Sequence, residues 1–308
     1  MIAVSKLSRL TPSDQDAIRG FQHRLDILRA RVNGVAQKKH VGAYISGPAG
    51  KGKTVTVLDT LDSQGIRHHV LNCRVSPGGL VDALRNNSHD IHVLDDVATL
   101  FAHKQALQVF LAALNGQANE ARTITYALKG RSAEKPFAFY GGIIAISNLP
   151  LQRDPLADAV ASRVRTLEHD PTDEMIAAVM RAKAFDGYED LSPDQCSEVV
   201  EFVIEESKTH EYRLDLRQMA HGWQDYRLWL HGESFRVHWQ ELVASSMRQL
   251  ALEDAPTLTK DEEKKLQQEK VRKAIAAHPG DRKRQIEATG LSERTFHRRL
   301  RELKLAVA

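Results

Sequence analysis

Short apolar runs, separated by segments with helical periodicity, fill the first half of the chain. The runs cover residues 41–46, 69–73, 91–94, 142–147 and 164–168. Between most of them, apolar side chains recur every three or four residues, which is the period of a helix packed on one face. Strands that alternate with helices predict a doubly wound α/β fold with a parallel sheet, which binds ligands at the carboxyl ends of its strands.

The pattern changes after Pro171, where helical periodicity continues and strand-like runs stop. The helical segments cover residues 173–185, 193–208, 215–230 and 239–250. Ser192, Pro193 and Gln195 form the signature of a helix N-terminus, with a capping serine, a proline at the first position and a capping-box glutamine. These features predict a helical domain after the sheet domain.

A polar stretch with one proline and no periodicity, residues 252–263, is typical of a linker. A small helical unit follows it. The expected organisation is therefore an α/β domain over residues 1–171, a helical lid domain over 172–251, the linker over 252–263, and a small all-α domain over 264–308.

The composition is typical of a globular protein without a membrane span. The chain has 308 residues, of which 42% are hydrophobic and 27% charged, as in ordinary globular proteins. No run approaches the roughly 18 apolar residues of a membrane span, and the N-terminus lacks the apolar core of a secretory signal. Cys73 and Cys196 lie far apart and match no metal-ligand spacing, so we expect buried or idle thiols. We expect a cytoplasmic protein without membrane contact.

A glycine-rich loop, residues 47–54, joins the first predicted strand to the helix that begins at Lys53. Its sequence, GPAGKGKT, fits G-x-x-x-x-G-K-T, in which glycines let backbone N–H groups surround a phosphate at a helix N-terminus. Lys53 is expected to reach the β- and γ-phosphates, and the Thr54 hydroxyl to ligate Mg²⁺. The alternative is a chance glycine-rich turn. The predicted nucleotide-binding residues are Gly47, Pro48, Ala49, Gly50, Lys51, Gly52, Lys53 and Thr54.

Acidic and amide side chains follow two later strands. In IHVLDDV, Asp95 is placed to hold Mg²⁺ through water, and Asp96 to orient the attacking water as general base. In IAISNLPL, Asn148 follows a buried strand and could hold the water between Asp96 and the γ-phosphate. The alternative for Asn148 is a cap of the next turn.

Two arginines are candidates for contact with the phosphates. Arg163, in AVASRVR, could stabilise the charge that develops on the γ-phosphate of a neighbouring subunit; the alternative is a basic residue on a surface helix. Arg217, in LDLRQM, stands at a predicted helix start in the helical domain, where it could fold over bound phosphates.

Over residues 41 to about 250, these motifs resemble the AAA+ ATPase family. The matching features are Walker A in GPAGKGKT, Walker B in IHVLDD, sensor 1 at Asn148, the arginine-finger dipeptide Ser162-Arg163, and sensor 2 at Arg217. The resemblance implies ATP and Mg²⁺ bound between a sheet domain and a helical lid, in oligomers whose subunits complete each other's sites. Most members have Glu where this chain has Asp96. Because Asp is shorter by one methylene, we expect slow, switch-like hydrolysis.

Residues 122–140 contain two β-prone runs, 123–126 and 136–140, around a polar turn. The segment resembles the hairpin inserted before sensor 1 in several DNA-handling AAA+ clades. Lys129 and Arg131 in the turn could follow a phosphate backbone; the alternative is a plain surface hairpin. The segment SPGGLVDAL, interpreted as a loop, lacks the aromatic-hydrophobic-glycine triplet of resembling protein-unfolding motors, which favours nucleic acid as the partner.

Charge is unevenly distributed along the chain. The net charge is +3, but 14 Lys and Arg against 8 Asp and Glu give residues 260–308 a net charge of +6. Within this tail, residues 282–288, a turn at Gly290 and a helix capped by Ser292 resemble a helix-turn-helix. The alternatives are a protein-docking helical hairpin and a solvated charged helix. The residues expected to contact DNA are Arg294, Thr295, His297, Arg298 and Arg301.

The combined hypothesis is a DNA-dependent ATPase that assembles on double-stranded DNA as a homo-oligomer, either a ring or a filament. Replication, recombination and transposition are the processes it suits, with a protein partner such as a helicase or recombinase. One alternative is an ATP-gated helix-turn-helix transcription regulator or signalling switch, which would not need DNA for turnover. A protein-remodelling chaperone ranks last.

Overall fold

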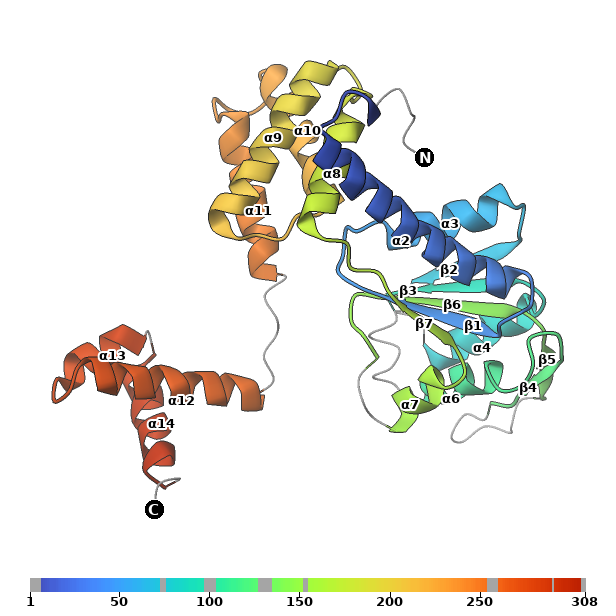
Figure 1. The fold of residues 1–308 in the computed structure, drawn as a ribbon. Helices are drawn as coiled ribbons and strands as arrows, with labels where there is room; N and C mark the ends of the chain where they lie inside the picture. Colours follow the sequence, from blue (N-terminus) through green and yellow to red (C-terminus); the bar gives the residue numbers. More distant parts are fainter. Residues whose placement is uncertain are drawn as a thin grey trace. The chain divides into compact units, whose positions relative to one another are not determined.

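The computed structural model describes residues 7–72, 76–96, 104–126, 135–151, 155–253, 260–289 and 291–305. The chain forms two compact units, residues 1–249 and 250–308. Both units are drawn in Figure 1. Within the described ranges, no helix combines the length and apolarity that crossing a membrane requires.

A five-stranded sheet forms the centre of the first unit, in the order β2-β3-β6-β1-β7, and every neighbouring pair in it is parallel. The predicted α/β fold with a parallel sheet is thus confirmed. Because β6 lies between β1 and β3, the carboxyl ends of these strands are adjacent: Ser46 pairs with Ser147, and Asp95 with Ile146. The strands are β1 (Gly42–Ser46), β2 (His68–Asn72), β3 (Ile91–Asp95), β6 (Gly142–Ser147) and β7 (Arg165–Glu168).

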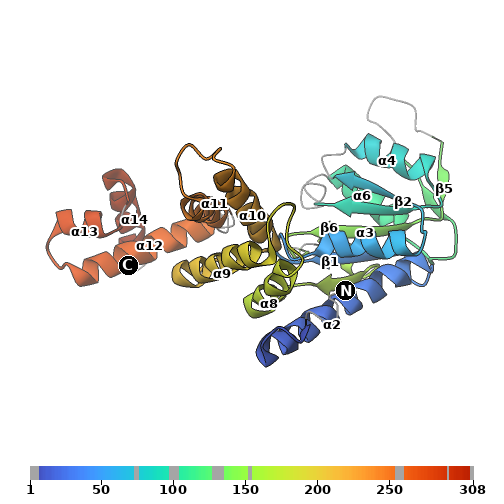
Figure 2. The same cartoon turned by 90° about the horizontal axis from the view of Figure 1, so that it is seen from above.

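Helices cover both faces of the sheet, as Figures 1 and 2 show. Branched side chains of β1, β3 and β6 pack on one face against α2 (Pro12–Ala36) and α3 (Lys53–Ser63). The other face packs against α4 (Pro77–Asn86), α6 (Lys104–Ala113) and α7 (Pro155–Ala161). This arrangement buries β1, β3 and β6 from both sides, whereas the edge strands β2 and β7 stay partly exposed.

A small antiparallel sheet stands apart from the main one. It pairs β4 (Arg122–Ile124) with β5 (Phe137–Phe139), so the two predicted β-prone runs do form strands that pair. Arg122 is buried at the base of this pair, where it donates to the carbonyls of Ala113 and Gly141. The predicted contact residues in the turn, Lys129 and Arg131, lie outside the described residues.

The helical region after the sheet contains α8 (Asp173–Ala184), α9 (Pro193–His210), α10 (Leu216–Leu230) and α11 (Trp239–Glu253). The capping box predicted at Ser192 is confirmed. Ile18 and Phe21 of α2 pack in the core of this region, whereas Leu28 and Val32 of α2 pack on the sheet. The N-terminal helix therefore joins both parts, which the boundary expected at residue 171 did not anticipate. Cys196 is buried in the same core.

Two local predictions were wrong. The segment SPGGLVDAL is not a loop: α4 begins at Pro77, Ser76 caps it by accepting from the Gly79 N–H, and its apolar side chains are buried despite two glycines. The predicted linker is also too long, because α11 continues to Glu253 and α12 begins at Lys260. The acidic residues after Lys260 suit the first turn of a helix, and the absence of apolar periodicity concealed it.

The second unit contains α12 (Lys260–Ala277), α13 (Arg282–Thr289) and α14 (Glu293–Leu305). Val271 and Phe296 are fully buried where α12 and α14 pack together. Ser292 caps α14, as predicted, by accepting from the Thr295 N–H. α13 ends at Thr289 and α14 begins at Glu293, so only residues 290–292 separate them in sequence.

Candidate functional site

The glycine-rich loop follows β1 directly, and its last two residues begin α3. Gly47 has φ 141°, and a Cβ there would lie 2.1 Å from the backbone oxygen of His169, so only glycine fits. Gly52 is the N-cap of α3, with φ 89°, and it has no side chain that could cap the first turn. The positive end of α3 therefore faces the loop, an arrangement that favours an anion.

A pocket of about 490 Å³ opens beside the loop, and we refer to it as the loop pocket. Its walls are the glycine-rich loop, the carboxyl ends of β3 and β6, and the first turn of α10. Binding sites for small molecules are typically about 300–1,000 Å³ in volume. The structure brings ten of the predicted site residues to this pocket: Ala49, Gly50, Lys51, Gly52, Lys53, Thr54, Asp95, Asp96, Asn148 and Arg217.

Lys53 is held by oxygen atoms at the pocket wall. Its Nζ donates to the carbonyls of Gly47, at 2.6 Å, and Pro48, at 2.7 Å, and lies 3.4 Å from Oδ1 of Asn148. Burial lowers the pKa of Lys53 to about 8; Asp95 opposes this shift and Arg217 adds to it. A phosphate group in the pocket would offset the burial and favour the charged ammonium.

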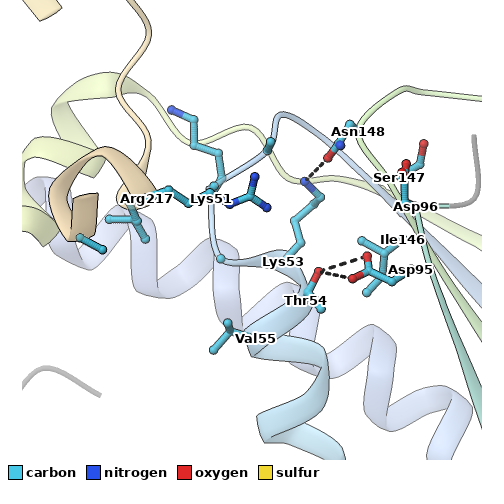
Figure 3. Close-up of a pocket in the computed structure, with 15 residues that line it drawn as sticks. Lys51, Lys53, Thr54, Val55, Asp95, Asp96, Ile146, Ser147, Asn148 and Arg217 are labelled. Carbon is cyan, nitrogen blue, oxygen red and sulfur yellow. Dashed lines mark hydrogen bonds between the residues drawn. The ribbon is translucent and has the colours of Figure 1, made fainter. Parts of the chain in front are cut away.

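Thr54 and Asp95 face each other across the pocket, as Figure 3 shows. The Thr54 hydroxyl lies 3.3 and 3.4 Å from the two carboxylate oxygens of Asp95. Mg²⁺ prefers oxygen ligands and usually keeps several waters beside one or two protein ligands. A hydroxyl and a carboxylate at the edge of an open pocket fit that preference.

Asp96 and Asn148 are exposed side chains at the ends of neighbouring strands, and both line the pocket. Asp96 adopts a left-handed backbone conformation with φ 59°, which turns the chain sharply at the end of β3. The turn after β6 is capped by Ser147, whose hydroxyl accepts from the Leu149 N–H. The side chain of Asn148 does not cap this turn, and its amide oxygen lies 3.4 Å from Nζ of Lys53.

Arg217 reaches the pocket from a different part of the chain. It lies in the first turn of α10, which Asp215 caps by accepting from the N–H groups of Arg217 and Gln218. The guanidinium is exposed and close enough to Lys53 to lower the pKa of that lysine. Sequence reasoning missed the apolar wall of the pocket, to which Val55, Leu216 and Ala220 contribute. Spacing along α10 could have indicated Leu216 and Ala220, which are four residues apart.

Arg163 is not brought to the loop pocket of its own chain. It follows α7 and precedes β7, whose first residue, Arg165, pairs with Ala43 near the start of β1. Arg163 is therefore at the amino edge of the sheet, whereas the pocket is at the carboxyl edge. Its side chain is exposed and donates to the Ala159 carbonyl at 2.6 Å.

The second unit presents exposed cationic side chains on α14. Arg298 and Arg301 are exposed, and His297 lies 3.9 Å from Glu293, one helical turn earlier. Thr295 bonds to the capping Ser292 hydroxyl at 2.9 Å. The backbone of Arg294 is helical, and its side chain lies outside the description.

Arg299 has a structural role that the sequence did not reveal. It is buried, and its guanidinium donates to Gln267 of α12, at 2.8 Å, and to Glu302, at 3.0 Å. These bonds hold α14 against α12. Of the neighbouring arginines in RRLR, only Arg298 and Arg301 are left facing solvent.

No family model matches the chain. It is similar to an uncharacterized 36.7 kDa protein in the nrdC-mobD intergenic region of Enterobacteria phage T4, with 27% identity over 160 residues. The match covers 48% of this chain and 48% of the phage protein, so the chain spans about half the length of the curated relative it matches.

Proposed function

We propose that this chain is an ATPase of the AAA+ type, which binds ATP with Mg²⁺ in the loop pocket. The observation that carries the proposal is the convergence of Lys53 and Thr54, at the start of α3, with Asp95 and Asn148, at the ends of adjacent strands. A cation, a hydroxyl, a carboxylate and an amide thus surround one pocket at a helix N-terminus.

Each of these residues has a defined task in hydrolysis. Lys53 exchanges its carbonyl partners for oxygens of the β- and γ-phosphates, while Thr54 and Asp95 hold Mg²⁺. Bound Mg²⁺ supplies positive charge that neutralises the phosphate oxygens. Asp96 accepts a proton from the water that attacks the γ-phosphorus, and Asn148 orients that water as the bond to ADP breaks.

An oligomer is part of the proposal because Arg163 is too far along the sheet to serve its own pocket. Arg163 crosses instead to the pocket of a neighbouring copy, where it stabilises charge on the γ-phosphate. Contacts that repeat head to tail in this way close into a ring or extend into a filament. ATP binding and assembly are then linked free energies.

DNA is the proposed macromolecular partner. The net charge of +6 over residues 260–308 and the exposed Arg298 and Arg301 on α14 support binding of a polyanion. The short connection between α13 and α14 supports entry of α14 into the major groove of double-stranded DNA.

The test is ATP hydrolysis by the purified protein with and without double-stranded DNA at fixed salt, repeated with Lys53→Ala and Arg163→Ala. Lys53→Ala should abolish turnover, and full turnover in that variant would refute the site. DNA stimulation that disappears in Arg163→Ala would support assembly on DNA for replication, recombination or transposition. Turnover that is indifferent to DNA would favour the ATP-gated transcription regulator, for which a short operator would be sought.

A further inference from the structure

Lys51 belongs to the glycine-rich loop, yet its ammonium bonds to residues of the helical region. Figure 3 shows it pointing away from Asn148 and Asp95, toward which Lys53 and Thr54 turn. The side chain of Lys51 is 1% exposed. Two lysines two residues apart therefore have different surroundings, although the sequence alone assigned both to the nucleotide.

The ammonium of Lys51 fastens the loop to the helical region. Its Nζ donates to the Leu214 carbonyl and lies 3.3 Å from Oδ1 of Asp173. The same carboxylate oxygen accepts from the Leu214 N–H at 3.1 Å. Leu214 is itself buried in the core of the helical region, so the bonds join the loop to that core. We call Lys51, Asp173 and Leu214 the latch.

Backbone contacts reinforce the latch on both sides. The Leu216 N–H, at the start of α10, donates to the Gly50 carbonyl at 3.0 Å. A Cβ on Gly50 would lie 2.2 Å from the carboxyl carbon of Asp215, which shows how closely the loop meets the N-terminus of α10. The buried His169 ring bonds to the Lys51 carbonyl through Nε2 at 2.9 Å.

Because the ammonium of Lys51 is buried, it depends on its partners in the latch. Burial lowers the pKa of Lys51, and the charge of Asp173 opposes that shift. A buried ammonium is costly to leave without partners, so the charged lysine and the Leu214 segment hold each other in place. Arg217 follows this segment by three residues and lines the loop pocket.

We propose that Lys51 is a positioning residue, which couples occupancy of the loop pocket to the placement of Arg217 and does not itself bind phosphate. The inference rests on the proposed function. A triphosphate that draws the loop backbone toward itself shifts Gly50 and Lys51, and through the latch it shifts the first turn of α10. By reciprocity, a misplaced α10 lowers the affinity of the pocket for ATP.

The first experiment needs no nucleotide. Hydrogen exchange of the Leu214 and Leu216 amides is measured in the wild type, in Lys51→Met, and in Lys183→Met, a matched change at an exposed lysine of α8. Met fills similar space without the charge, so Lys51→Met should speed exchange at both amides about tenfold, the scale of one charged hydrogen bond. Lys183→Met should leave exchange unchanged. Unchanged exchange in Lys51→Met would overturn the latch.

The second experiment measures binding of ATP and of ADP to Lys51→Met, Arg217→Ala and the double variant. We expect Lys51→Met to weaken ATP binding about tenfold and ADP binding less, because it acts through Arg217. The double variant should be no weaker than Arg217→Ala alone. Lys51→Arg, which keeps the charge, should restore part of the ATP preference.

The outcomes separate this inference from the proposed function. Losses that multiply in the double variant, or a Lys51→Met protein that binds no nucleotide, as expected for Lys53→Ala, would overturn the coupling. The second result would make Lys51 a phosphate ligand. If the wild type binds no ATP, the proposed function fails and the coupling fails with it, whereas the exchange experiment still decides whether the latch exists.

Discussion

The ammonium of Lys53 lies 3.4 Å from the side-chain oxygen of Asn148, so a lysine of the glycine-rich loop meets an amide from the end of a neighbouring strand. The two residues are 95 positions apart in sequence. Their meeting follows from the sheet order, in which β6 pairs directly with β1. It joins the part of the pocket that would bind phosphate to the part that would position water.

Nucleotide binding should depend on pH through Lys53. The pKa of this lysine is lowered to about 8 in the free protein, and a bound triphosphate raises it by favouring the charged form. ATP affinity should therefore fall as the pH rises through about 8, approaching about tenfold per pH unit. The terminal phosphate titrates near pH 6, well below this window. Calorimetry in buffers of different ionisation enthalpy should detect proton uptake on binding.

Lys53→Arg provides the control for this pH dependence. The guanidinium stays charged throughout the window, so its ATP affinity should be lower than that of the wild type but flat between pH 7 and about 9. A wild-type affinity that does not change over the same range would show that Lys53 is already fully charged in the free protein.

Asn148→Ala separates binding from turnover. The amide is expected to orient water in the transition state, so its loss should lower kcat about a hundredfold, the scale of one lost transition-state hydrogen bond. ATP affinity should change little, because the proposed bonds from Lys53 to the phosphates do not involve this amide. Single-turnover hydrolysis and equilibrium binding measure the two effects. A drop in affinity with unchanged kcat would assign Asn148 to nucleotide binding instead.

Two substitutions of Asp96 separate the effect of its left-handed backbone conformation on stability from the effect of its carboxylate on hydrolysis. Asp96→Gly and Asp96→Ala should both lose hydrolysis, because both remove the carboxylate. Asp96→Gly should be more stable than Asp96→Ala by about 1 kcal/mol, since alanine is penalised at the observed φ of 59°. Urea unfolding gives the difference in the free energy of unfolding. Equal stabilities would mean that the left-handed conformation is not kept in the variants.

The arginines of α14 should divide into two classes. Replacing the exposed Arg298 and Arg301 with alanine should weaken DNA binding and lower the salt slope by about 2, one unit for each lost phosphate contact. Thermal stability should not change. Arg299→Ala should instead lower the stability of the second unit, because it removes the hydrogen bonds to Gln267 and Glu302 that hold α14 against α12.

Lys273→Ala, at an exposed lysine of α12, is the matched control for charge. If it flattens the salt dependence as much as the α14 variants do, contact with DNA is not focused on α14. Unchanged binding in a chain that lacks residues 260–308 would direct attention to Lys129 and Arg131 instead.

Local structure could be predicted from the sequence because it depends on neighbours within a few residues. The strands, the glycine-rich loop, the capping box at Ser192 and the cap at Ser292 could be located from periodicity and turn chemistry alone. The same reasoning failed at Pro77, where a serine cap and a buried apolar face outweighed two glycines, and at Lys260, where a helix begins without apolar periodicity.

The sequence by itself determined which residue types end the strands and that a phosphate-compatible loop precedes a helix. Only the tertiary structure decided that β6, which Asn148 follows, lies between β1 and β3. It also decided that Arg163 lies at the opposite edge of the sheet from the loop pocket, and that α2 packs both on the sheet and in the core of the helical region. Only it showed that the ammonium groups of the two lysines in the loop have different partners, the Gly47 and Pro48 carbonyls for Lys53 and the latch for Lys51. The physical reason is that strand order and the burial of a charge depend on residues far away in sequence. Asn148 lies 95 positions from Lys53, the latch partners of Lys51 lie 122 and 163 positions away, and local propensity carries no information about them.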